Sequence, residues 1–176
     1  MDVNATKETD EVGTLETAAD GRSVLRYRRR LAHPPEKVWR ALTEDGHLAA
    51  WFPTTIEGPR QAGAALRFSF RNGEGEPFAG EMLAFEPPSL LELRWSDDVL
   101  RFELEAAGTG SVLSLIVTFP EHGKAARDGA GWHVCLERLA AESDGTTPPA
   151  DDRWRVVHAR YVGALGPEAS TIGPPG

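Results

Sequence analysis

Cysteine and positive charge are both scarce in this sequence. Cys135 is the only cysteine among 176 residues, and the net charge is −8. One cysteine cannot form an internal disulfide, so we expect a reducing compartment, the cytoplasm. The acidic balance leaves no cationic face for a phosphate backbone or an anionic membrane. We therefore expect neither nucleic acid nor a membrane surface as a partner.

Long apolar runs are also missing. No stretch approaches the roughly 20 residues that a helix needs to cross a bilayer. The first residues, 1–20, are acidic and polar, without the basic and apolar segments of a signal peptide, and we expect them to be a disordered tail. With 40% hydrophobic and 26% charged residues, the chain has the composition of an ordinary globular domain.

The motifs of common catalytic and cofactor sites are absent as well. No serine lies in a Gly-x-Ser-x-Gly context, and no glycine-rich loop precedes a helix in the manner that binds phosphate. The aspartate pairs at 97–98 and 151–152 fall at a hairpin turn and a helix start, where aspartate is favoured for backbone reasons. Because the histidines lack a second ligand at suitable spacing, we expect no metal and no cofactor. The five histidines are His33, His47, His122, His133 and His158.

Alternating strand patterns occupy much of the chain. Residues 22–31 alternate with a period of two, which places Leu25, Tyr27 and Leu31 on one face. Five further strands are predicted between residues 64 and 119, joined by short turns. Consecutive strands joined in this way form an antiparallel sheet with one apolar and one solvated face.

Helical patterns flank these strands. Two short helices are predicted between residues 34 and 53, a long helix over residues 124–142, and a last helix over residues 151–166. The long helix and the sheet each have one apolar face, so the economical arrangement packs them together. We predict an α+β helix-grip fold, in which an antiparallel curved sheet of about six strands wraps around a long C-terminal helix.

These elements divide the chain into three parts. Residues 1–20 form the tail, residues 21–145 the helix-grip domain, and residues 146–176 a linker, a short C-terminal helix and a second tail. The length favours one domain with one core.

Four segments occur together in a characteristic order and spacing. They are the proline-led helix with Val38-Trp39, the Trp51-Phe52-Pro53 stretch, the strand from Gly80 to Pro87-Pro88, and the Gly131-Trp132 start of the long helix. Together they resemble the START-like (SRPBCC) superfamily of helix-grip proteins. Within it they look like bacterial members of the family named after the activator of the heat-shock-protein-90 ATPase.

The resemblance implies a cavity between the sheet and the long helix, which superfamily members use for lipids, sterols, polyketides or hormones. It does not imply a chaperone function, because the eukaryotic activators bear an additional N-terminal domain that residues 1–20 cannot supply. The aromatic side chains of the chain either fill the core or line this cavity, and a cavity lined by them takes an apolar or aromatic ligand. The family geometry places six residues around it: Trp51, Phe70, Trp95, Phe102, Trp132 and Leu136.

In the long helix, Cys135 and His133 suggest a catalytic pair or half of a metal site. Residues two apart on a helix point in nearly opposite directions, so these two side chains cannot act together. We expect Cys135 to face the sheet beside Trp132, with a pKa raised by burial. We expect His133 to face solvent, where it reaches Glu137 at i+4.

The sequence leaves three functional hypotheses open. The first, which we favour, is non-catalytic binding of a small hydrophobic molecule in the cavity. The second is a cyclase or dehydratase in the same cavity, which needs an internal acid or base from Glu81, Arg29 or Tyr161; Arg29 more readily reaches solvent from its strand end. The third is a chaperone cofactor or another protein-interaction role, through an exposed stripe of Trp154, Val157 and Tyr161.

Overall fold

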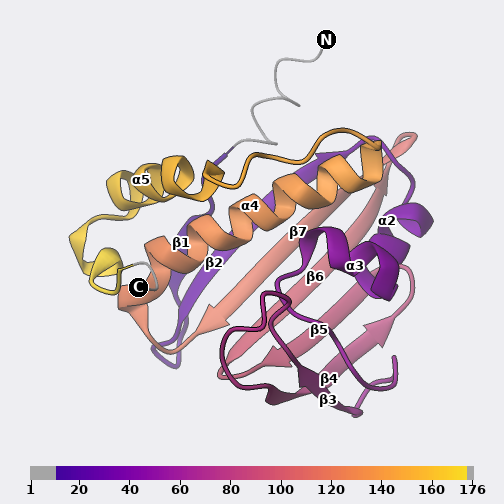
Figure 1. Cartoon of the computed structure of the whole chain (residues 1–176), viewed down its shortest axis with the longest axis horizontal. Coiled ribbons are helices and arrows are strands. Elements are labelled where there is room, and N and C mark those ends of the chain that lie inside the picture. The colour runs from indigo at the N-terminus through magenta and orange to yellow at the C-terminus, as the bar shows by residue number, and fades with distance from the viewer. Residues whose placement is uncertain (1–10, 174–176) are drawn as a thin grey trace.

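Seven antiparallel strands form one sheet in the computed structural model, which describes residues 11–173. Their spatial order is β1-β2-β7-β6-β5-β4-β3 (Figure 1). The strands are β1 Thr14–Thr17, β2 Ser23–Leu31, β3 Ala65–Phe68, β4 Phe78–Glu86, β5 Leu90–Trp95, β6 Asp98–Ala107 and β7 Gly110–Phe119. Strands β4 to β7 follow one another as hairpins, as the predicted meander requires, and β2 closes onto β7.

Helices cover one face of this sheet. They are α2 Pro35–Thr43, α3 Asp45–Trp51, α4 Ala125–Asp144 and α5 Arg153–Leu165, with short 3-10 turns at η1 His122–Lys124 and η2 Pro167–Ser170. The long helix α4 crosses the sheet, and α5 lies beside its first half (Figure 1). The fold is therefore the predicted helix grip. No helix within residues 11–173 has the length and apolarity to cross a membrane.

Strand β1 is the addition to the six predicted strands. It lies within residues 1–20, which we expected to be a disordered tail, and it pairs with residues 23–26 of β2. Its sequence, TLET, has a single apolar residue, so no alternating pattern marks it. Backbone hydrogen bonds to β2 at the sheet edge hold it instead. Residues 1–10 of the predicted tail lie outside the described residues.

The core lies between the sheet and α4. On β2 the side chains of Leu25, Tyr27 and Leu31 are buried, as the period of two predicted. Burial of each such side chain contributes about 1.5–3 kcal/mol. Arg29 shares this face and is only 4% exposed, so our expectation that it reaches solvent was wrong.

Helix α5 is packed against α4. A Cβ atom at Gly129 would lie 2.8 Å from the ring of Tyr161, so glycine permits this close approach. Val157 and Tyr161 are fully buried, and Trp154 is half-buried. The stripe that we expected to offer a protein partner is therefore not an exposed surface.

Candidate functional site

A cleft of about 1310 Å³ opens between the β5–β6 turn, the first half of α4 and the start of α5. One wall is aromatic and comes from the sheet side and α4. The other wall comes from α5, where the rings of Trp154 and His158 stack with their centroids 4.5 Å apart. The cleft therefore lies at one end of the space between the sheet and the long helix.

The aromatic wall is built from Phe70, Phe78, Trp95 and Trp132. The ring of Trp95 is its centre, with centroids 5.2 Å from Phe78, 5.4 Å from Trp132 and 6.1 Å from Phe70. All three contacts are edge-to-face, the geometry that ring quadrupoles favour. The indole N–H of Trp95 donates to Thr54 Oγ1 at 3.2 Å, which fixes its orientation.

The six residues that the resemblance placed around a cavity fall into two groups. Phe70, Trp95 and Trp132 line the cleft. The others, Trp51, Phe102 and Leu136, lie in the adjoining core and are at most 3% exposed.

Close packing of the core explains why Trp51, Phe102 and Leu136 do not line the cleft. The indole N–H of Trp51 donates to the Ala41 carbonyl at 2.7 Å, and its ring meets Phe102 at a centroid distance of 5.9 Å. Side chains thus occupy the middle of the interior, and the open space lies at its end.

Charged side chains line the cleft where the start of β6 meets the start of α4. Lys124 Nζ lies 2.9 Å from an oxygen of Asp98 and 3.4 Å from Asp128, which also accepts from Arg127 Nε at 2.9 Å. Burial raises the pKa of Asp98 even though Lys124 opposes that change. These groups largely neutralise one another.

Sequence reasoning missed the role of Asp98. We assigned it with Asp97 to a hairpin turn, and Asp97 is indeed an exposed turn residue, but Asp98 begins β6 and is only 3% exposed. No local pattern marks its partner, because Lys124 is 26 positions away in the chain.

None of the three candidate acids and bases of the enzyme hypothesis lines the cleft. Glu81 is opposite Arg94 in the β4–β5 pairing, and the adjacent pair is Gly80 with Trp95. Because successive residues of a strand face opposite sides, Glu81 points away from the face that carries Trp95. Arg29 and Tyr161 lie instead in a buried polar cluster.

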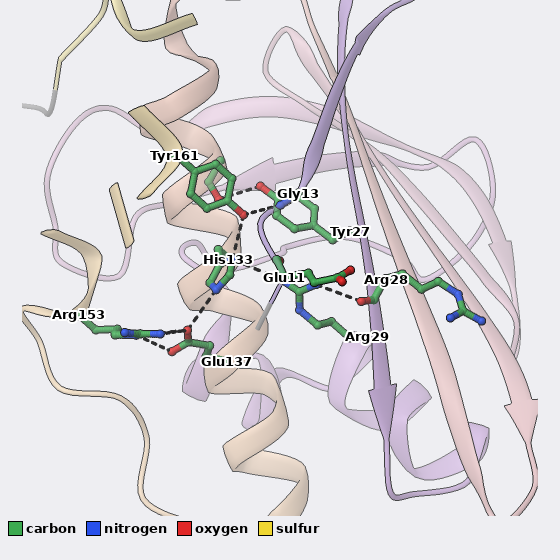
Figure 2. A network of polar contacts seen from close by, with 10 residues as sticks. Glu11, Gly13, Tyr27, Arg28, Arg29, His133, Glu137, Arg153 and Tyr161 are labelled. Atoms are coloured by element: carbon green, nitrogen blue, oxygen red, sulfur yellow. Dashed lines mark hydrogen bonds and ion pairs between the residues drawn. The ribbon is translucent and has the colours of Figure 1, made fainter. Parts of the chain in front are cut away.

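This buried polar cluster comprises Arg29, His133, Glu137, Arg153 and Tyr161 (Figure 2). His133 Nδ1 lies 2.8 Å from Tyr161 Oη and 3.3 Å from Arg29 Nη2. A guanidinium only donates, so Nδ1 is the acceptor and Nε2 carries the proton. That nitrogen faces Glu137 Oε1 at 3.3 Å, which confirms the predicted i+4 contact.

The predicted solvent exposure of His133 was wrong, since it is 0% exposed. The reason is that α5 covers the side of α4 that we expected to face solvent.

Cys135, by contrast, is half-buried in the cleft lining, and burial raises its pKa to about 12. It is therefore a poor nucleophile, as expected. Residues 11–173 contain no group of three or more histidine, cysteine or carboxylate side chains that could hold a metal ion.

Comparison with known proteins supports the fold. A family model described as Activator of Hsp90 ATPase homolog 1-like protein matches residues 32–144. The chain is similar to EF2215 from Enterococcus faecalis, a conserved protein of unknown function, with a TM-score of 0.73 and 21% identity over 92% of this chain and 95% of that one. No curated protein matches the chain.

Two further solved structures share the architecture. CalU16 from Micromonospora echinospora has a TM-score of 0.68 and 21% identity over 93% of this chain and 100% of that one. The protein encoded by BPP1335 from Bordetella parapertussis has a TM-score of 0.65 and 26% identity, over 87% of this chain and 92% of that one.

Proposed function

The chain belongs to the Activator of Hsp90 ATPase homolog 1-like family, and from that premise we propose that it binds a small hydrophobic molecule in the cleft without catalysing a reaction. The observation that supports this is the aromatic wall, whose rings border an open volume of about 1310 Å³. Ligand pockets typically span about 300–1,000 Å³, so the cleft has room for a multi-ring molecule. The lone cysteine favours a reducing compartment, the cytoplasm, as the place of binding.

Apolar burial would supply most of the affinity. Phe70 is 37% exposed, an uncommon exposure for a large aromatic side chain, and its ring lies against Phe78 and Trp95. A ligand covering these rings removes apolar surface from water at about 25 cal/mol per Å². Polar groups that line the cleft would orient the ligand.

Substitution of Gly131 tests whether the cleft binds the ligand. It lies on α4 in the cleft lining, and a Cβ atom there would meet only Trp154 Nε1, at 3.9 Å. Gly131→Ala therefore fits, whereas Gly131→Phe places a ring in the cleft. We expect Gly131→Phe to weaken binding of the neutral fluorophore N-phenyl-naphthylamine about tenfold or more, and Gly131→Ala to leave it unchanged. Fluorescence titration measures both.

Native mass spectrometry of the protein purified from its own cells complements this titration. We expect a co-purified hydrophobic molecule in the wild-type protein and its loss from Gly131→Phe. If both variants bind the fluorophore like the wild type, or the fluorophore does not bind at all, the cleft is not the ligand site that we propose.

A further inference from the structure

The indole N–H of Trp132 lacks an acceptor in the protein. Trp132 is 5% exposed and lines the cleft, and none of its neighbours within residues 11–173 accepts a hydrogen bond from it. Trp95, on the same wall, donates to Thr54, and Trp51 in the core donates to Ala41. A largely buried indole normally finds such a partner.

The Trp132 N–H is not sealed in the interior. Trp132 Nε1 is not among the fully enclosed polar atoms that lack a partner within residues 11–173. Water in the cleft can therefore reach the N–H. A purely hydrocarbon ligand that displaced this water would leave the donor unsatisfied, which opposes binding, whereas a ligand with a suitably placed oxygen would replace the water.

A second indole donor lies nearby on α5. Trp154 also lines the cleft, and its Nε1 is the atom closest to a Cβ built at Gly131, the residue before Trp132. Like Trp132, it has no acceptor among the described residues. Two helices thus each contribute to the cleft lining an indole whose N–H has no acceptor among the described residues.

The charges around this end indicate an uncharged acceptor. Lys124 is shared between Asp98 and Asp128, and Arg127 is paired with Asp128. An anionic or cationic group beside these four side chains would have to break their pairs, whereas Arg155, which also lines the cleft, is an exposed residue of α5, where an ion pair contributes little. A neutral oxygen needs only the N–H donors, and it disturbs no ion pair.

We propose that the cleft selects aromatic molecules that carry an uncharged acceptor oxygen, such as an aryl ketone, and that Trp132 Nε1 donates to this oxygen with Trp154 as a second donor. This inference rests on the proposed function and narrows its ligand class. A site built around a donor discriminates against analogues that lack the acceptor, because they leave the donor unpaired.

Benzophenone and diphenylmethane test the proposal, because they differ mainly by a carbonyl in place of a methylene group. Isothermal titration gives the ratio of their affinities for wild type, Trp132→Phe and the control Trp51→Phe, a core residue whose N–H the Ala41 carbonyl already accepts. We expect the ratio to shift away from benzophenone by about fivefold in Trp132→Phe and to stay unchanged in Trp51→Phe.

The outcomes separate this inference from the function it rests on. An unchanged ratio in Trp132→Phe, with both probes still binding, overturns the acceptor inference and leaves ligand binding intact. Failure of both probes to bind the wild type overturns both.

The carbonyl stretch of bound benzophenone gives a second measurement that needs no folded Trp132 variant. Infrared spectra should place it at the lower wavenumber of a hydrogen-bonded ketone. A wavenumber equal to that in alkane overturns the inference.

Discussion

Glu137 lies between His133 on its own helix and Arg153 at the start of α5. The Nε and Nη2 atoms of Arg153 lie 2.9–3.2 Å from oxygens of the carboxylate, and His133 Nε2 lies 3.3 Å from Oε1. Burial by itself would raise the pKa of Glu137, but these hydrogen bonds and charges outweigh it and hold the pKa at about 2. The carboxylate therefore stays ionised in the folded protein under conditions that protonate it in the unfolded chain.

Glu137→Gln tests this arrangement through the dependence of stability on pH. Because the folded pKa is lowered, the carboxylate stabilises the fold fully above pH 4.5, and this contribution is lost as the pH falls towards 2. We expect the variant to lose about 1–2 kcal/mol of unfolding free energy at pH 7. The difference from wild type should shrink below pH 4.5. Urea titrations across this range measure it, and a constant difference would contradict the assignment.

The residues of the buried polar cluster show where local patterns stop being informative. The spacing of His133 and Glu137 predicted their contact, because neighbours at i+4 share a helix face. Nothing nearby in the sequence shows that Arg29 and Tyr161, which are 104 and 28 positions from His133, close over that face. Burial of a polar side chain by distant elements is a tertiary property, and a single sequence does not encode it locally.

At the scale of elements, two glycines of α4 lie against different surroundings. Gly129 faces α5, where a Cβ atom would come within 2.8 Å of the Tyr161 ring. Gly131 faces the cleft, where the nearest atom would be 3.9 Å away. The same substitution two positions apart therefore has opposite effects.

We expect Gly131→Ala to stabilise the protein by about 0.5–1 kcal/mol, because alanine restricts the unfolded chain and favours the helix. Gly129→Ala gains the same helical preference but forces α5 off α4, and we expect a net loss of about 1–3 kcal/mol. Thermal unfolding of the two variants side by side measures the difference. Equal melting temperatures would mean that α5 is not held where the structure has it.

Most elements were predictable because each carries its own periodic pattern. The bounds of β2, α2, α4 and α5 agree with the predictions to within a few residues. Strand β1 was missed because an edge strand without apolar alternation leaves no pattern. The resemblance indicated an opening bordered by Trp95 and Trp132, but the position of the open space depends on which side chains fill the middle of the core. Trp51 and Phe102 fill it, and their residue types do not distinguish them from the aromatic residues that line the cleft.

At the scale of the molecule, the two ends of the described chain are tied together. Tyr161 on α5 accepts a hydrogen bond from the Gly13 N–H at 2.9 Å, just before β1, and its hydroxyl also contacts His133 on α4. Burial raises the pKa of Tyr161, so the hydroxyl keeps its proton and donates to His133 Nδ1. One side chain thus joins the segment before β1, the long helix and the C-terminal helix.

Tyr161→Phe should therefore loosen elements that are far apart in sequence. Loss of the hydroxyl leaves the Gly13 N–H and His133 Nδ1 without this partner, at a cost of about 2 kcal/mol. We expect faster hydrogen exchange in both β1 and α5, with β4 and β5 unchanged, because local opening follows the contacts that are lost. Thr54→Val is the control, since it removes a buried hydroxyl whose hydrogen bond is to Trp95 on β5, and it should leave exchange in β1 and α5 unchanged. Exchange that rises in α5 but not in β1 would show that the contacts of β1 and the preceding residues with β2, such as that of Arg29 Nη2 with the Glu11 carbonyl, hold this segment without Tyr161.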